Sequence, residues 1–414
     1  MRGLAAYTMV TIARRSLRDQ AGKASMAEQI RLAAPFLDHA EEQAVVEALR
    51  SGWISHGPKC IAFEQAMADV IGVAHGRSVN SGTSAIHLAL EALGIGKGDE
   101  VIVPAFTCAA AVFPIENLGA TPRCVDIELP RYSLDPRKLA RTITPSTKAV
   151  VVAHLFGGAA DMQGILGVTK DSSVHVIEDN ALGLGAAVGG RMTGSFADAA
   201  CLSFHPRKMI TTGEGGMLLS NSPELTARVT ELRAYGASVA AWQRHQSAVS
   251  QLPGYRAAGH NFKMTDIQAA MGIEQLRKLP EIIARRRAIA DRYGSRLAAL
   301  PWLELPREIS GETHVFQSYV CLVRGPEPTS GSRRRLRGEL IEHLAARGIA
   351  SVQAAQAMAS IEYFQRKYGW SADDFPVARE ADDSTIALPI HPGMETGDQE
   401  RVIDAILEFV PAAR

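Results

Sequence analysis

Apolar residues follow two different spacings along the chain, and each spacing predicts a different kind of element. Continuous apolar runs predict buried strands at residues 101–103, 123–126, 149–155, 174–178, 199–204 and 217–220. Apolar residues three or four positions apart predict helices at residues 85–93, 109–118, 281–300, 334–347 and 398–409. Because short buried strands alternate with helices, we expect an α/β fold with a mainly parallel central sheet covered by helices.

The first firm helix of the chain is predicted to begin near Asp38. Glu41 follows three positions later, a pattern that is typical of a capping box. Val45, Val46 and Leu49 then recur at helical spacing, and we expect these three side chains to form the apolar face of the helix.

Pro301 marks a candidate domain boundary. It closes the helix at 281–300, on which Arg285, Arg286 and Arg287 are expected to form a basic exposed face. A strand near 316–323 and two helices beyond it suit a smaller C-terminal α/β domain. We therefore expect three parts: a flexible N-terminal arm at residues 1–30, a large cofactor-binding domain at 31–300 and a small domain at 301–414.

Composition and charge narrow the class of protein. The 414 residues are 46% hydrophobic and 21% charged, as in a globular protein with a large core. Lys+Arg and Asp+Glu both number 44, so no net charge attracts nucleic acid or an acidic membrane. The longest apolar stretch, residues 101–115, contains two prolines and is too short to span a membrane. The five scattered cysteines fit a reducing cytoplasm and indicate neither disulfides nor a structural zinc site.

Lys208 lies at the centre of a glycine-rich segment, residues 203–216, between two predicted strands. A lysine forms a Schiff base with a carbonyl cofactor only when its amine can lose a proton, which requires partial burial. Gly213, Gly215 and Gly216 would let backbone N–H groups approach a ligand closely. On this segment alone, a surface lysine in a glycine-rich hairpin is an equally good interpretation.

Residues 80–84, Asn-Ser-Gly-Thr-Ser, open the predicted helix at 85–93. Small residues at a helix N-terminus leave its N–H groups and positive dipole end free to bind an anion. The alternative is plain N-capping by Ser81 or Thr83.

Asp179 follows directly after the predicted strand at 174–178, and ligands in open α/β sheets collect at such strand ends. A pyridoxal ring needs an anion beside its pyridine nitrogen, so that the protonated ring can accept electrons. Asp179 could instead be an ordinary helix cap. Together, the lysine, the aspartate and the anion-binding helix start favour a pyridoxal-phosphate (PLP) enzyme over these separate alternatives.

Many stretches of the sequence also resemble one known family. They are residues 51–54 (Ser-Gly-Trp-Ile), 80–85, 104–107 (Pro-Ala-Phe-Thr), 154–157 (His-Leu-Phe-Gly), 178–179, 203–216, 260–270 and 388–392. From Leu32 to the C-terminus the chain resembles the nucleotide-sugar aminotransferases of the DegT/DnrJ/StrS type, which are fold-type-I PLP enzymes and homodimers.

The resemblance implies a role for most residues of the candidate site. Lys208 would hold the cofactor as a Schiff base and act as the catalytic acid and base, and Asp179 would pair with the pyridine nitrogen. The remaining cofactor-binding residues would be Ala181 under the ring, Gly82, Thr83 and Ser203 at the phosphate, and Asn261, which would reach the phosphate of the second subunit. A dehydrating branch of the family has histidine in place of the lysine, and Lys208 argues against that branch.

Two positions depart from the family pattern. Cys108 stands where an aromatic residue commonly stacks on the cofactor, and Leu182 stands where His or Gln can hydrogen-bond its phenolic oxygen. Cysteine offers a smaller contact than an aromatic ring, and leucine cannot hydrogen-bond. We expect Cys108 to be a small buried residue rather than a reactive thiol.

The expected activity is transfer of an amino group from an amino-acid donor, L-glutamate or L-glutamine, to a keto group of a nucleotide-linked sugar. A keto-cyclitol is an alternative acceptor. Leu182 also leaves open a non-transaminating PLP enzyme, such as a dehydratase or lyase, and a regulatory protein without cofactor is the remaining class. By resemblance and composition we expect a cytoplasmic homodimer with no nucleic-acid or membrane partner.

Overall fold

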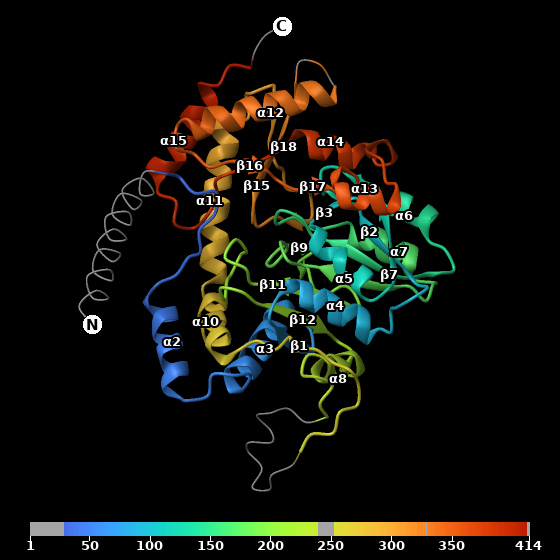
Figure 1. Ribbon diagram of the computed structural model, residues 1–414. Helices are drawn as coiled ribbons and strands as arrows, with labels where there is room; N and C mark the ends of the chain where they lie inside the picture. The colour runs from blue at the N-terminus through green and yellow to red at the C-terminus, as the bar shows by residue number, and fades with distance from the viewer. Residues whose placement is uncertain (1–28, 239–251, 326, 328, 412–414) are drawn as a thin grey trace, which may run out of the picture.

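The computed structural model describes residues 29–238, 252–325, 327 and 329–411. Its centre is a seven-stranded sheet in the order β1-β12-β11-β8-β7-β2-β4 (Figure 1). The strands are β1 (His75–Val79), β2 (Glu100–Pro104), β4 (Thr121–Val125), β7 (Thr147–Ala153), β8 (His175–Asp179), β11 (Ala199–Ser203) and β12 (Gly216–Ser220). Only β12 runs opposite to the other six strands of this sheet, which confirms the expected α/β fold with a mainly parallel sheet.

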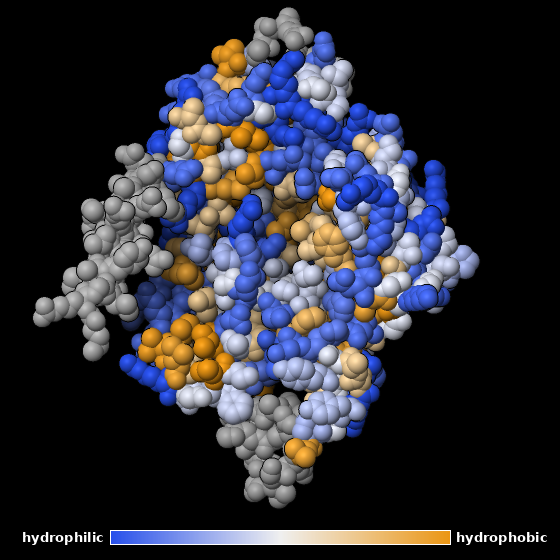
Figure 2. Space-filling model, in the orientation of Figure 1, coloured by the Kyte–Doolittle hydropathy of each residue, from blue (hydrophilic) through white to orange (hydrophobic). Residues whose placement is uncertain are grey.

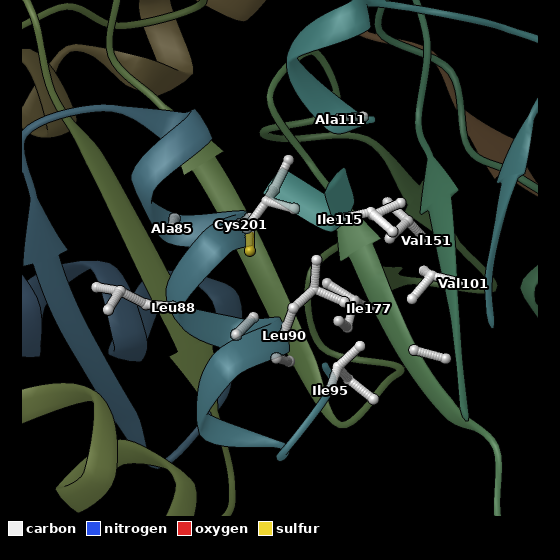
Figure 3. Close-up of a cluster of buried hydrophobic side chains, with 14 of the residues drawn as sticks. Ala85, Leu88, Leu90, Ile95, Val101, Ala111, Ile115, Val151, Ile177 and Cys201 are labelled. Carbon is white, nitrogen blue, oxygen red and sulfur yellow. The ribbon is translucent and has the colours of Figure 1, made fainter. Parts of the chain in front are cut away.

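Both faces of the central sheet are buried. Val101, Val151 and Cys201 point to one face and pack with Leu90 (Figure 3). Their strand neighbours, such as Ile102 and Val150 or Ala200 and Leu202, belong to clusters on the opposite face. Successive side chains of a strand alternate between faces, so a sheet covered on both sides needs continuous apolar runs. This is why apolar runs predicted six of the seven strands, whereas the edge strand β1, whose sequence is His-Gly-Arg-Ser-Val, has no such run and was not predicted.

Helices and short strands surround the central sheet. The helices are α2 (His39–Arg50), α3 (Pro58–Ile71), α4 (Gly82–Ala92), α5 (Phe113–Asn117), α6 (Pro136–Thr142), α7 (Met162–Thr169), α8 (Pro223–Leu232) and α10 (Asp266–Arg277). Short strands pair as β10-β9-β14 (Arg191–Met192, Ala187–Val188, Glu312–Thr313), β17-β3 (Gln356–Ala357, Phe106–Thr107) and β5-β6 (Ile127–Glu128, Ser133–Leu134).

The helix expected at 109–118 is two shorter pieces. A 3₁₀ turn at Ala109–Ala111 is followed by α5, which begins at Phe113. Pro114 has no N–H group and fits only in the first turn of a helix, so the helix restarts there.

The apolar face of α2 is not the face that packs on the rest of the chain. Leu49 is 52% exposed, whereas Ala44 and Ala48 are buried against Ala270 of α10. Small side chains let the two helices approach closely, and the larger apolar residues of α2 are turned toward its outer side. Glu41 does form the predicted capping box, since the backbone N–H of Asp38 donates to its carboxylate over 2.9 Å.

A second sheet belongs to the C-terminal part of the chain. Its order is β13-β15-β18-β16 (Leu303–Glu304, Tyr319–Val323, Thr385–Leu388, Val352–Gln353), and all its pairs are antiparallel. The helices of this part are α11 (Leu279–Leu297), which runs into it from α10, α12 (Ser330–Ala345), α13 (Glu362–Tyr368), α14 (Pro376–Ser384) and α15 (Thr396–Leu407), with 3₁₀ turns at Met358–Ser360 and Ala372–Asp374 (Figure 1). The division at residue 300 stays a prediction.

Arg286 was expected on an exposed face of α11, and this is wrong. The side chain is buried, and its guanidinium donates hydrogen bonds to the carbonyls of Phe316 (3.3 Å), Gln317 (2.9 Å) and Ile390 (3.0 Å). Burial lowers the pKa of Arg286 to about 10. The arginine therefore ties α11 to the segments that follow the expected boundary.

The expected N-terminal arm lies outside the described residues except for its last two positions. Of these, Ile30 is buried and pairs with Ile349 in a parallel bridge. Among the described helices, none is both long and apolar enough to cross a lipid bilayer.

Candidate active site

Several chain segments meet at one edge of the central sheet. Strands β1, β8 and β11 point the same way, so their carboxyl ends share this edge, and antiparallel β12 begins there. In register, Asp179 of β8 lies opposite Cys201, and Gly216 lies opposite both Ser203 and Val79. The sheet therefore brings Asp179, Ser203 and the helix start after Val79 together, and Asp179 lies at a strand end as predicted.

The turn that carries Lys208 connects β11 to β12 and is held by its own backbone. Phe204 closes it at the base, donating to the carbonyl of Gly215 over 2.8 Å and accepting from Thr212 over 3.0 Å. The backbone N–H of Lys208 donates to the carbonyl of His205 over 2.8 Å. From the C-terminal part, Gln317 donates to the carbonyl of Arg207 over 2.6 Å, which fixes the turn beside the lysine.

The start of α4 is packed tightly against β11 and β12. A Cβ on Gly82 would lie 2.8 Å from the Cβ of Ser203, and one on Gly216 would lie 2.4 Å from the backbone of Ser81. Ser81 is the N-cap and accepts a hydrogen bond from the N–H of Ser84 over 3.1 Å. Capping by Ser81 is thus correct, and it leaves the first N–H groups of the helix available to an anion.

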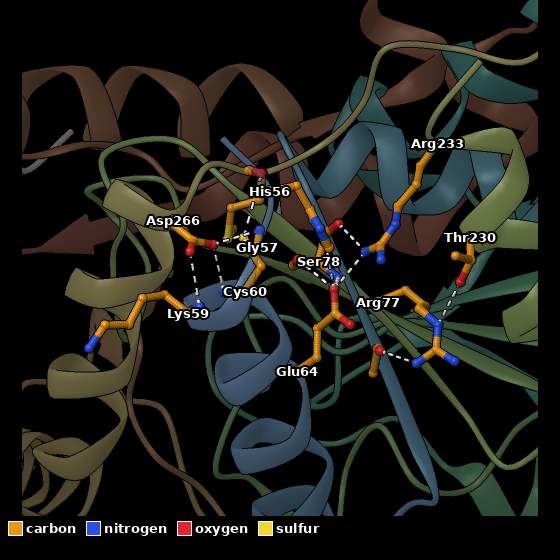
Figure 4. Close-up of polar contacts among 12 residues, drawn as sticks. His56, Gly57, Lys59, Cys60, Glu64, Arg77, Ser78, Thr230, Arg233 and Asp266 are labelled. Carbon is orange, nitrogen blue, oxygen red and sulfur yellow. Dashed lines mark hydrogen bonds and ion pairs between the residues drawn. The ribbon is translucent and has the colours of Figure 1, made fainter. Parts of the chain in front are cut away.

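A buried ion pair fixes the strand that leads to this helix (Figure 4). One carboxylate oxygen of Glu64 accepts hydrogen bonds from Arg233 (2.6 Å) and from the N–H (2.9 Å) and hydroxyl (2.7 Å) of Ser78. Burial alone would raise the pKa of Glu64, but Arg233 and His56 outweigh it and hold the pKa well below its usual value. Ser78 is one of the last residues of β1, so the network sets where α4 begins.

Asp266 performs a similar task for α3 (Figure 4). The N-cap residue of α3, Gly57, has no side chain, and the carboxylate of Asp266 accepts the N–H groups of Gly57 (2.8 Å), Lys59 (3.1 Å) and Cys60 (3.0 Å) instead. A carboxylate also interacts favourably with the positive end of the helix dipole. The start of α10 therefore caps the start of α3.

Asp179 is buried at the end of β8, and its carboxylate accepts the N–H of Ala181 over 3.1 Å. Burial raises the pKa of Asp179, against the opposing effects of this N–H, Lys208 and His154. The adjacent Glu178 is also buried and accepts from His154 over 2.8 Å. Since the other ring nitrogen of His154 accepts the N–H of Ala160, Nε2 carries the proton that reaches Glu178. His154 was noted in the sequence without this role.

A cavity of about 450 Å³ lies over this edge of the sheet. Seven of the eight predicted site residues line it: Gly82, Thr83, Cys108, Asp179, Ala181, Ser203 and Lys208. The eighth, Asn261, is not among its lining residues; it is exposed and accepts a hydrogen bond from Lys263. Leu182 also lines the cavity. Cys108 is exposed toward this space, so the expectation that it is buried is wrong.

The electrostatic setting of Lys208 suits an amine that must lose its proton. Burial lowers the pKa of Lys208, although Asp179 and Cys108 partly oppose the shift, and Arg207 adds to it. Burial therefore outweighs the nearby carboxylate, and both groups line one cavity.

The other walls of the cavity come from segments that the sequence did not assign to it. They include Leu32 and Ala33 near the N-terminus, Gln317 and Ser318, and Leu388 and Ile390. No local pattern marks these residues as site residues, because only the packing of the C-terminal part against the large sheet brings them to the cavity.

A lysine amine, a buried carboxylate and a helix N-terminus around one cavity on an α/β sheet are the features of a PLP-dependent enzyme of fold type I. The residues present fit the cofactor: the amine can bind its aldehyde, the carboxylate its ring nitrogen, and the helix start its phosphate.

Comparison with known proteins agrees with this class. Residues 35–407 match the DegT/DnrJ/EryC1/StrS aminotransferase family. The chain is 37% identical over 380 residues to the spore coat polysaccharide biosynthesis protein SpsC of Bacillus subtilis, covering 92% of this chain and 96% of SpsC. It is 38% identical over 381 residues to the GDP-perosamine synthase of Caulobacter vibrioides, covering 91% and 97%.

Solved structures are similar over the same range. The PLP form of the Streptococcus pneumoniae protein Spr1654 has a TM-score of 0.83 at 28% identity, covering 91% of this chain and 97% of that one. DesV of S. venezuelae has a TM-score of 0.78 at 32% identity, covering 91% and 98%. The chain belongs to the DegT/DnrJ/EryC1/StrS aminotransferase family and is a PLP-dependent aminotransferase.

Proposed function

We propose that the protein transfers an amino group from L-glutamate or L-glutamine to a keto group of a nucleotide-linked sugar. Two relatives support a sugar acceptor: SpsC functions in spore coat polysaccharide biosynthesis, and the 38% identical Caulobacter enzyme makes GDP-perosamine. The observation that carries the proposal is that Lys208 and Asp179 line one cavity with the start of α4.

Lys208 and Asp179 divide the chemistry between them in this proposal. Bound PLP supplies an electron sink that stabilises negative charge on the carbon beside the transferred nitrogen. Lys208 anchors the cofactor and, when its amine is free, moves the proton between the donor's α-carbon and the cofactor. Burial lowers the pKa of Lys208, which favours the unprotonated amine that accepts this proton. Asp179 keeps the ring nitrogen protonated.

The phosphate end of the cofactor is assigned to the start of α4 and to β11. The N–H groups of Gly82 and Thr83 and the hydroxyl of Ser203 would bind the phosphate, and Ala181 would pack under the ring. Gly82 approaches β11 so closely that a side chain there would displace the helix start. This close approach supports a role in holding a small anion between the two elements.

We also propose that the protein acts as a homodimer in the cytoplasm. Asn261 lies outside the cavity of its own chain, as expected for a residue that reaches the partner's phosphate. An apolar patch covers the region of α2 and the start of α3 (Figure 2). The exposed large apolar residues of this region are Leu37 (47%), Leu49 (52%), Ile54 (50%) and Ile61 (49%). Contiguous apolar surface of this kind is typical of an interface.

The test is an absorption spectrum of the purified protein before and after addition of L-glutamate. Loss of the visible band of lysine-bound PLP, with a rise in the near-ultraviolet band of pyridoxamine phosphate, supports glutamate as donor. Lys208→Ala should lack the visible band and turnover while keeping the wild-type circular dichroism. A Lys208→Ala protein that still transaminates would refute the assignment of Lys208.

A panel of acceptors separates the remaining alternatives. The enzyme with pyridoxamine phosphate bound is mixed with nucleotide-linked keto-hexoses and, separately, with keto-cyclitols. The acceptor class that restores the visible band of lysine-bound PLP is the one the enzyme uses. Return with keto-cyclitols alone would replace the sugar by the cyclitol alternative. Membership of an aminotransferase family argues against the regulatory and lyase alternatives, and Lys208, in place of the histidine of the dehydrating branch, argues against a dehydratase.

A further inference from the structure

Three side chains outside the active site form a compact group with the composition of a metal site. His87 and Glu91 lie one turn apart on α4, and His260 comes from a segment 169 residues beyond Glu91. One ligand atom from each residue lies within 4.8 Å of the other two. We name these residues the His87 cluster, and we propose that it binds one divalent transition-metal ion, most favourably Zn²⁺.

The distances within the His87 cluster suit a single ion. The Nε2 atom of His260 lies 2.8 Å from a carboxylate oxygen of Glu91, and Nε2 of His87 lies 3.6 Å from the same oxygen. Two ligands on a tetrahedral zinc ion, each bonded at about 2.1 Å, stand roughly 3.4 Å apart. The two distances lie on either side of that value, so small rotations of the side chains would complete the coordination.

The contact between His260 and Glu91 does not explain why His87, the third residue of the cluster, lies beside them. The Nε2 atom of His87 is buried and has no hydrogen-bond partner, although it faces the carboxylate of Glu91. A buried polar atom without a partner is costly, and a metal ion would give it one.

Packing orients both imidazole rings. The ring of His260 stacks on Phe262 with centroids 4.6 Å apart and planes 6° apart, and the ring of His87 meets His260 edge-on at 4.9 Å. The backbone N–H of His260 donates to the carbonyl of Leu232 at the end of α8 over 2.6 Å. Rings held in this way lose little further freedom when they bind an ion.

Ligand chemistry selects the type of ion. Two imidazoles and one carboxylate suit zinc, whereas calcium and magnesium prefer oxygen ligands alone. The side chains of His87, Glu91 and His260 are 12%, 22% and 30% exposed, so an ion and a water molecule as fourth ligand can reach them from solvent. The sequence contains no cysteine or Cys/His spacing that predicts zinc, and the His87 cluster forms only because the fold brings His260 to α4.

The ion would join α4 to the segment that precedes Asn261. Backbone hydrogen bonds already tie the residues around Asn261 to their neighbours. The carbonyl of Phe262, for example, accepts from the N–H of Asn80 over 2.8 Å. Any effect of zinc on the cofactor rests on the proposed role of Asn261, whereas zinc binding by the cluster does not.

The experiment is a zinc titration of the untagged holoenzyme in competition with a chromophoric chelator. We expect the wild type to bind one zinc ion per chain, and His260→Ala and Glu91→Gln to bind it at least about tenfold more weakly. The matched control is His175→Ala, which removes another histidine near a carboxylate, Asp198, at 3.6 Å. It should bind zinc as the wild type does.

Glu91→Gln keeps the shape of the side chain, so the test remains valid even if His260→Ala fails to fold. Circular dichroism and the cofactor band show whether each variant is folded. Cobalt gives a second readout, because Co²⁺ bound by the cluster should show visible absorption that both variants lose and His175→Ala keeps. Equal zinc affinity in wild type, His260→Ala and Glu91→Gln would overturn the proposal, as would wild-type holoenzyme that binds no zinc.

Discussion

Replacing Glu64 by Gln removes a charge from a buried network and keeps the shape of the side chain. The side chains of Glu64 and Arg233 are only 9% and 5% exposed, so water cannot compensate the arginine that remains. Removing one partner of a buried ion pair costs about 3–5 kcal/mol. The amide oxygen of Gln could still accept from Ser78, and we therefore expect the lower figure, about 3 kcal/mol, for Glu64→Gln and the upper one for Glu64→Ala.

The assay is urea unfolding of the holoenzyme, followed by circular dichroism. The matched control is Glu362→Gln, which breaks a pair with Arg366 at 3.6 Å whose side chains are 79% and 74% exposed. Exposed pairs contribute little, so its midpoint should stay close to that of the wild type. Because Ser78 leads to the start of α4, Glu64→Gln should also release PLP faster on dialysis. A Glu64→Gln midpoint as close to wild type as that of Glu362→Gln would refute the reasoning.

The Glu64 network should also make the stability of the protein depend on pH. The pKa of Glu64 in the folded protein is below its unfolded value, so its stabilisation is present above about pH 4.3. This stabilisation is lost as the pH falls below about 4.3 and through the pKa that Glu64 has in the folded protein. The difference in unfolding midpoint between wild type and Glu64→Gln should therefore be full at pH 7 and shrink in acid below about pH 4. A difference that grows in acid would contradict the sign.

Further predictions concern the active site. Asp179→Asn should lower kcat about 100-fold or more while PLP stays bound, because a buried electrostatic interaction worth about 3 kcal/mol is lost in the transition state. Gly82→Ala places its Cβ 2.8 Å from that of Ser203 and should weaken PLP affinity, whereas the control Gly294→Ala, whose Cβ meets nothing within 4 Å, should not. Cys108→Tyr offers an aromatic face within the cavity and should slow PLP loss on dialysis; unchanged release would count against stacking at this position.

Local patterns in the sequence were sufficient for six of the seven strands of the central sheet and for Lys208 and Asp179, which line the cavity. The strands were recognisable because both faces of the sheet are buried, which requires continuous apolar runs. Lys208 and Asp179 follow such runs, whereas small polar residues marked the start of α4, and in the fold all three lie at one edge of the sheet. Their grouping around a cavity therefore followed from the segments in which they occur.

Tertiary structure decided which polar residues are buried and what they contact. Arg286 has the helical position of an exposed residue, yet carbonyl groups near residues 316 and 390 surround it. Glu64 meets Arg233 across 169 positions of sequence, and His260 meets Glu91 across the same separation. Residue spacing describes a segment by itself, whereas the burial of a charge depends on the segments that pack against it, and for these residues only the folded chain contains that information.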